Sequence, residues 1–274
     1  MTRHPDRGHG PALVTRGHGP TLVMVPGLAA TAGFFAEAVA RLATRHRVVV
    51  VELPGHGDNA TADRPANLTR AAEDLHTTIE KLDLTDVTLL GWSLGATVAY
   101  GYLEQFGVAR IRALVSVEQT PRLLRDDDWP YAAFGNLDAA GADAVLASVT
   151  GDYPVFAAGL IRGSFAAGTE PDPATLAGLI DQTRRCDPDA VRALLAEALA
   201  VDWRERLRRI SVPTLLVHGA HSQVYPGDVG EWLRSAIPAS RLEVFTGSGH
   251  LPFVEEPDRF ADLVSTFVDH PVAT

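Results

Sequence analysis

The sequence predicts an α/β protein built on a doubly wound, mostly parallel sheet with an inserted helical cap. Short runs of β-branched residues alternate along the chain with stretches of helical periodicity, which is the pattern of repeated strand–helix–strand units. Some runs are apolar throughout, such as the valines at 48–51, and strands of this kind are buried on both faces by flanking helices. The expected strands are Thr21–Val25, Arg47–Glu52, Val87–Gly91, Ile111–Val117, Pro213–His218 and Arg241–Phe245.

A short duplication precedes these strands. The pentapeptide Arg-Gly-His-Gly-Pro occurs at residues 7–11 and again at residues 16–20, with Ala-Leu-Val-Thr between the two copies. Because the duplication does not continue into a repeat array, we interpret it as a pair of turns around a short edge strand.

Apolar stripes at helical spacing separate the strands and predict helices that pack on the sheet. Since these stripes recur every three or four residues, we assign them to the core and not to a cofactor site. The clearest ones are Phe35, Ala38, Val39 and Leu42; then Leu68, Ala72, Leu75, Ile79 and Leu82; and finally Phe260, Leu263, Val264 and Phe267.

The interval 121–209 interrupts the alternation, because it has helical patterns but no convincing strand. We therefore expect a core of residues 1–120 and 210–274 and a helical cap of residues 121–209. A cap over the carboxyl ends of the strands would cover the crevice where open α/β sheets bind ligands, and would shape the pocket.

The composition favours a globular protein that acts on a small molecule. The formal net charge of −10 argues against a nucleic-acid partner, because phosphates need a basic surface. No window approaches the roughly 20 apolar residues of a membrane span, and no apolar core follows the first basic residues. Cys186 is the only cysteine, which excludes an intramolecular disulfide. We expect a cytoplasmic monomer or homodimer with no membrane partner.

The strongest chemical signal is Gly91-Trp92-Ser93-Leu94-Gly95, which follows a predicted strand and opens an apolar helix. This is the context of the G-x-S-x-G nucleophile elbow, where a tight turn presents the serine Oγ at the top of a sheet. The alternative is an ordinary turn with a serine at the start of a helix. We take Ser93 as the candidate nucleophile and the Leu94 N–H as a candidate donor to an oxyanion.

Two further loops complete the expected site. The turn after the strand Thr21–Val25 contains Leu28, whose N–H is the second candidate oxyanion donor; the alternative is a plain strand-ending turn. Near the C-terminus, His250 lies between a glycine-rich loop and an apolar helix, and it can serve as the general base. Its alternative is a loop histidine with a structural role.

These segments together resemble the α/β-hydrolase superfamily. The landmarks are Pro26-Gly27-Leu28, Glu52-Leu53-Pro54-Gly55-His56-Gly57, Gly91 to Gly95, and Gly249-His250-Leu251-Pro252, and they extend from about residue 20 to the end of the chain. The resemblance implies the fold and a serine–histidine–acid triad, and leaves the substrate open.

The acid departs from the usual pattern of this superfamily. Many members place an aspartate in a Gly-x-x-Asp arrangement where this chain has Gly219-Ala220-His221-Ser222. We therefore predict that Glu118, at the end of the strand Ile111–Val117, holds the histidine; lactonases of the zearalenone-degrading type look similar in this respect. Asp228 is the second candidate acid, although a role at the start of a helix suits it better.

Aromatic residues near these loops are candidates for substrate contacts, although core packing explains them as well; they are Trp92, Trp129, Tyr131 and Tyr153. We expect no cofactor and no metal, because His218 and His221 lack the carboxylate or cysteine that would complete a zinc site. His56 is interpreted as a structural loop residue.

The expected function is a serine hydrolase that cleaves an ester, lactone or thioester of a small, largely uncharged molecule through an acyl-enzyme. Two alternatives stay open. One is a carbon–carbon bond hydrolase or a cyclase that uses the same triad, and the other is a ligand-binding protein with negligible turnover.

Overall fold

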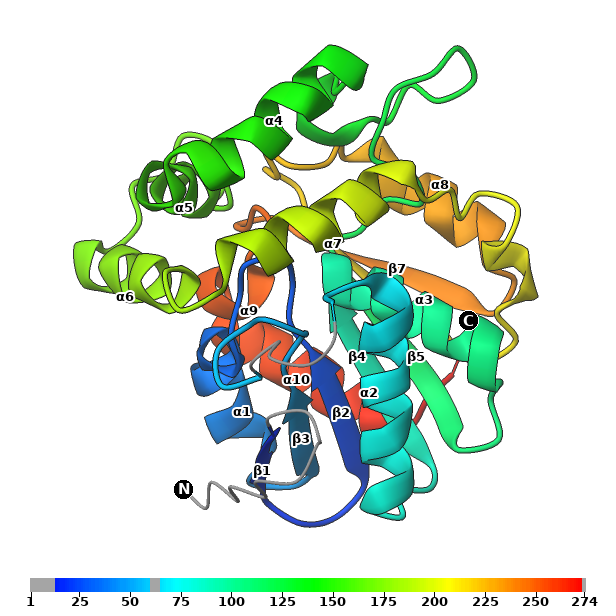
Figure 1. Ribbon diagram of the computed structural model, residues 1–274. Coiled ribbons are helices and arrows are strands. Elements are labelled where there is room, and N and C mark those ends of the chain that lie inside the picture. The colour runs from blue at the N-terminus through cyan, green and yellow to red at the C-terminus, as the bar shows by residue number, and fades with distance from the viewer. Residues whose placement is uncertain (1–12, 60–64, 273–274) are drawn as a thin grey trace.

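A single seven-stranded sheet organises the computed structural model, which describes residues 13–59 and 65–272 (Figure 1). The strand order is β1-β3-β2-β4-β5-β6-β7. The six predicted strands are all present, and their ends differ from the expected ones by at most one residue. The strands are β1 (Leu13–Arg16), β2 (Thr21–Val25), β3 (Arg47–Val51), β4 (Val87–Trp92), β5 (Ile111–Val117), β6 (Thr214–Gly219) and β7 (Ser240–Phe245).

The strand β1 lies at one edge and pairs antiparallel with β3, whereas the other neighbouring strands pair in parallel. This confirms the short edge strand expected from the duplicated pentapeptide. The second copy forms the turn into β2, with positive φ angles of 74° at Gly17 and 105° at Gly19. The first copy, residues 7–11, lies outside the described residues.

Helices cover both faces of the sheet. Alternation along a strand divides its side chains between two apolar cores: Val23 and Val25 of β2 face one, and Leu22 and Met24 face the other. The first core includes residues of α2 (Leu68–Lys81), α3 (Leu94–Phe106) and α8 (Asp228–Ala236). The second includes residues of α1 (Ala36–Leu42), α9 (Pro252–Glu255) and α10 (Pro257–Asp269). The fold is therefore the doubly wound α/β fold that the sequence predicts.

The chain between β5 and β6 carries four α-helices, which Figure 1 shows grouped on one side of the molecule. They are α4 (Ala139–Gly151), α5 (Tyr153–Arg162), α6 (Pro173–Thr183) and α7 (Pro188–Ala200). Short 3-10 turns lie at Ala32–Phe35, Ala133–Gly135 and Leu207–Arg209. The helices have a small apolar core of their own, in which Val149 of α4 contacts the buried face of α7, and Ala29 from the loop after β2 joins it. We call residues 121–209 the helical insertion.

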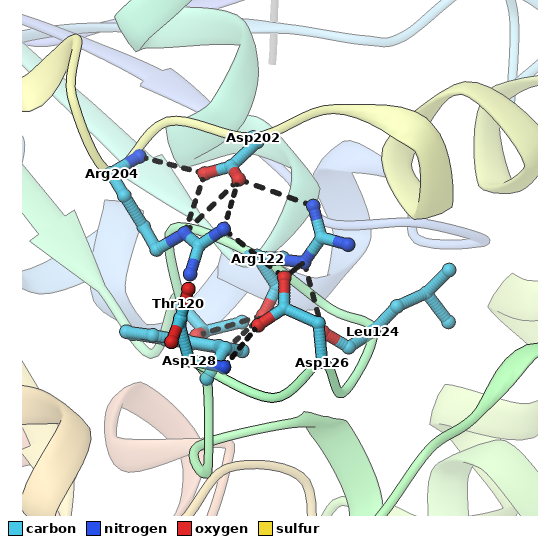
Figure 2. Close-up of polar contacts among 8 residues, drawn as sticks. Thr120, Arg122, Leu124, Asp126, Asp128, Asp202 and Arg204 are labelled. Atoms are coloured by element: carbon cyan, nitrogen blue, oxygen red, sulfur yellow. Dashed lines mark hydrogen bonds and ion pairs between the residues drawn. The ribbon is translucent and has the colours of Figure 1, made fainter.

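The two ends of the helical insertion are tied together by ion pairs (Figure 2). Arg122 lies 3.0 Å from Asp126 and 3.1 Å from Asp202, and Arg204 lies 3.1 and 2.7 Å from the same two carboxylates. The N–H of Trp203 also donates to the carbonyl of Pro121 at 2.9 Å. We call the four charged residues the ion-pair network. It holds the segment that enters the insertion beside the segment that leaves it.

Within the ranges 13–59 and 65–272, no helix has both the length and the apolar character that a bilayer crossing requires.

Candidate active site

Ser93 lies at the sharp turn between β4 and α3. Its φ of 53° and ψ of −123° are strained for a residue with a side chain. The flanking glycines allow this turn: a Cβ on Gly95 would lie 2.1 Å from the carbonyl oxygen of Val25, and one on Gly91 would lie 2.4 Å from the Cα of Ala96. The backbone therefore has the form that a nucleophile elbow needs, with the serine raised above the strand ends.

His250 and Glu118 meet although they are far apart in sequence. The Nδ1 of His250 lies 2.8 Å from Oε2 of Glu118, and both residues are buried. A carboxylate can only accept a hydrogen bond, so Nδ1 carries the proton and Nε2 is left as the acceptor. An imidazole in this tautomer can take a proton from a serine hydroxyl.

Glu118 stays ionised inside the protein. Burial raises the pKa of this carboxyl, but hydrogen bonds and charge interactions with His218 and His250 outweigh it and lower the pKa to about 2. The N–H of Gly219 also donates to Oε1 at 2.8 Å, and Nδ1 of His218 lies 3.4 Å from the same oxygen. The carboxylate is therefore available to hold a cationic imidazole.

The structure separates the two candidate acids. Asp228 is exposed in the first turn of α8, whereas Glu118 contacts His250. Ser222, in the segment where the sequence has no aspartate, donates from Oγ to Oε2 of Glu118 at 2.7 Å. The serine thus helps to orient the carboxylate that contacts His250.

The loop after β2 lies beside the elbow. Leu28 and Leu94 line one pocket with Ser93, and the Leu94 N–H is in the first turn of α3, where helical N–H groups have no partner within the helix. The buried His56 braces this loop, since its Nε2 accepts from the Ala29 N–H at 2.9 Å while Nδ1 lies 3.0 Å from the carbonyl of Pro54. Burial lowers the pKa of His56 to about 4, against the opposing effect of the Pro54 hydrogen bond, so the ring remains a neutral acceptor.

The pocket over Ser93 is mostly apolar and extends under the helical insertion. Its polar side chains include Ser93, His250, Gln119, Ser164 and Tyr225. Helices of the insertion contribute Val145, Leu160, Ile161, Leu195, Ala198 and Leu199. Ser93, His250 and the helical insertion therefore line the same cavity.

Of the four aromatic residues expected to contact a substrate, Trp92 lines this pocket, and its Nε1 donates to the carbonyl of His250 at 2.8 Å. The other three are not among its lining residues. Trp129 is buried with its ring against Tyr131 and Trp232, and Tyr153 donates to the carbonyl of Thr183. Their packing partners, and not the pocket, explain their positions.

Two pocket residues carried no signal in the sequence. Gln119 donates from Nε2 to the carbonyl of Ser93 at 2.7 Å and to Thr97 Oγ1 at the same distance, so it anchors the elbow. Tyr225 is buried, lines the pocket together with Ser93, and packs its ring against that of His250. No motif points to either residue, because only the folded chain brings them to the elbow. In the described part of the chain, no group of three or more histidine, cysteine or acidic residues could hold a metal ion.

The fold and the site together define an α/β protein with a serine, a histidine and a carboxylate gathered at the carboxyl edge of a parallel sheet. The chain belongs to the Alpha/beta hydrolase family, which matches residues 22–263.

Individual proteins in the comparisons are named as esterases. The chain is 29% identical over 269 residues to a pimeloyl-[acyl-carrier protein] methyl ester esterase of Neisseria meningitidis serogroup B, with 98% of each chain covered. The protein of the same name from Nitrosomonas europaea is 30% identical over 242 residues, covering 87% of this chain and 92% of the relative. An esterase from Exiguobacterium antarcticum has a similar structure, with a TM-score of 0.87, 28% identity, and coverage of 94% of this chain and 95% of that one.

Proposed function

We propose that the protein is a serine hydrolase that cleaves an ester, lactone or thioester of a small, largely uncharged molecule. The observation that carries the proposal is the buried hydrogen bond between His250 and Glu118, 2.8 Å long, in the pocket of the strained Ser93 elbow. Relatives named as methyl ester esterases support a carboxylic ester as the substrate. The place of Glu118 resembles that in lactonases, which keeps lactones within the proposed range.

The proposed reaction is a two-step acyl transfer. Nε2 of His250 takes the Ser93 proton as Oγ attacks the ester carbonyl, and the Leu28 and Leu94 N–H groups stabilise the oxyanion. Glu118 stabilises the imidazolium while it exists. The imidazolium then protonates the leaving alcohol, and a water molecule activated by the same histidine releases the acid and restores Ser93.

We propose that the helical insertion acts as a cap that selects the acyl group. Its α-helices contribute six apolar side chains to the pocket, and burying apolar substrate area yields roughly 25 cal/mol per Å². An uncharged, moderately apolar acyl group therefore fits better than a charged one.

The test is a burst experiment with a p-nitrophenyl ester and a fluorophosphonate label. Wild-type protein is expected to release a burst of nitrophenol and to gain the label on Ser93, whereas Ser93→Ala loses both. Ser164→Ala is the matched control, because Ser164 lines the same pocket and its Oγ donates to a helix carbonyl, that of Leu160. Turnover that survives Ser93→Ala, or a label on another residue, would contradict the proposal and favour the alternatives of ligand binding or a different chemistry.

A further inference from the structure

Tyr225 lies in the pocket beside the residues of the proposed acyl transfer, yet that reaction does not use it. It follows β6, is only 5% exposed, and lines the pocket together with Ser93 and His250. Burial raises the pKa of its phenol, and the neighbouring Ser93 side chain acts on the hydroxyl in the opposite direction. Its ring packs edge-on against the ring of His250, with centroids 5.3 Å apart and an interplanar angle of 69°.

The segment around Tyr225 is fixed to the triad acid. The backbone N–H groups of Val224 and Tyr225 both donate to Oγ of Ser222 at 3.3 Å, and the same hydroxyl donates to Glu118. The carbonyl of Val224 accepts from the Phe134 N–H at 2.7 Å. Tyr225 is therefore held in place before any substrate binds, as a preorganised donor should be.

The strand order shows which part of a substrate Tyr225 would meet. The candidate oxyanion loop with Leu28 follows β2, on one side of β4, whereas Glu118 follows β5 and Tyr225 follows β6, on the other side. A carbonyl oxygen directed at the Leu28 and Leu94 N–H groups thus points away from Tyr225. The side of Ser93 that carries His250 and Tyr225 is left for the leaving group.

We propose that the Tyr225 hydroxyl hydrogen-bonds to the leaving-group oxygen of the substrate and makes the enzyme suited to esters of alkyl alcohols. This inference rests on the proposed function. When the tetrahedral intermediate collapses, the carbon–oxygen bond to the leaving group breaks, and its electron pair goes to that oxygen. The proton comes from Nε2 of His250, and Tyr225 donates a hydrogen bond while keeping its own proton.

The state of the phenol suits this role. Burial raises the pKa of Tyr225, against the smaller opposing effect of the Ser93 side chain, so the hydroxyl remains a donor at neutral pH. An alkoxide is a far poorer leaving group than a nitrophenolate, so stabilising its developing charge matters more. The need for Tyr225 should therefore grow with the basicity of the leaving alcohol.

The experiment compares Tyr225→Phe with wild type on two esters of the same acid, an ethyl ester and a p-nitrophenyl ester, by kcat/KM, which reports acylation for both. We expect a loss of roughly 10- to 100-fold on the ethyl ester and less than about 3-fold on the p-nitrophenyl ester. Tyr131→Phe, an aromatic residue outside the pocket lining, should change neither value.

The outcomes separate this inference from the proposed function. Equal losses on both esters would indicate a merely structural role for Tyr225, and no loss would show that the hydroxyl does not act; either result overturns the inference. If Ser93→Ala still hydrolysed both esters, the proposed function itself would fail. Loss of both activities in Ser93→Ala with no discrimination in Tyr225→Phe would overturn only the role of Tyr225.

Discussion

At Glu118, burial and hydrogen bonding act against each other. The side chain is fully buried at the end of β5, where its φ of 47° is unusual for a residue with a Cβ. It remains ionised because four groups face its two oxygens: His250, His218, Ser222 and the N–H of Gly219. A strained backbone and a buried charge are costly, and such costs are commonly found where a residue serves catalysis.

This environment predicts the effect of removing the charge. Glu118→Gln is expected to lower kcat by about 10³- to 10⁴-fold, as loss of a triad acid does, because the amide can neither hold the imidazolium nor specify its tautomer. Asp228→Asn serves as the control and should leave kcat within about 2-fold, since Asp228 is exposed in the first turn of α8. The measurement is steady-state hydrolysis of a p-nitrophenyl ester. A larger loss of kcat in Asp228→Asn than in Glu118→Gln would show that the assignment of the acid to Glu118 is wrong.

At the scale of the elements, the placement of the helical insertion depends on how its two ends are joined to the sheet. The ion-pair network consists of side chains that are 23 to 32% exposed, so its attractions are partly screened by solvent. The guanidinium of Arg204 also lies 5.6 Å from the ring centroid of Trp129. These contacts restrain the two ends of the insertion, while its helices α4, α5 and α7 line the pocket.

Asp202→Asn should weaken the ion-pair network that joins the two ends of the insertion. The variant removes a carboxylate shared by two arginines, and we expect it to lower the free energy of unfolding by on the order of 1 kcal/mol. It should also increase hydrogen exchange in α4 to α7, and the difference should shrink in high salt. Glu231→Gln is the matched control, because it breaks an exposed pair with Arg234 on α8. Equal effects of the two variants on exchange in the insertion would contradict a role for the ion-pair network.

At the scale of the whole molecule, net charge acts on any charged substrate. The formal net charge of −10 creates a repulsive field for anions, and ions in solution screen this field over about 10 Å at 0.1 M salt. The apolar pocket lining acts in the same direction, because it offers little to compensate a charge that leaves water.

We therefore predict different salt responses for two p-nitrophenyl esters of similar size, one with a neutral acyl group and one with a terminal carboxylate. The value of kcat/KM for the anionic ester should rise a few-fold between about 10 and 500 mM salt, and that for the neutral ester should stay nearly constant. The neutral ester is the internal control for salt effects on the enzyme. A fall in kcat/KM for the anionic ester would reveal a local basic group that recognises carboxylates.

Most of the fold could be predicted because its signals are local. Apolar runs identified the strands to within one residue at each end, and the stripes between them identified helices. The glycines around Ser93 marked a tight turn, which a Cβ at position 95 would block. The sequence also placed His250 and Glu118 after strands, and the structure brings their side chains into contact. In each case, a short stretch of chain carries the steric or hydrophobic constraint.

Only the tertiary structure decided which residues far apart in the sequence come into contact, because no local pattern connects them. Glu118 and His250 are 132 residues apart, and Tyr225 reaches Ser93 only because β6 lies two strands from β4 in the sheet. Trp129, Tyr131 and Tyr153 looked like pocket residues in the sequence and pack elsewhere. An aromatic ring has the same identity in a core and in a pocket, and long-range packing of the helical insertion selects between the two.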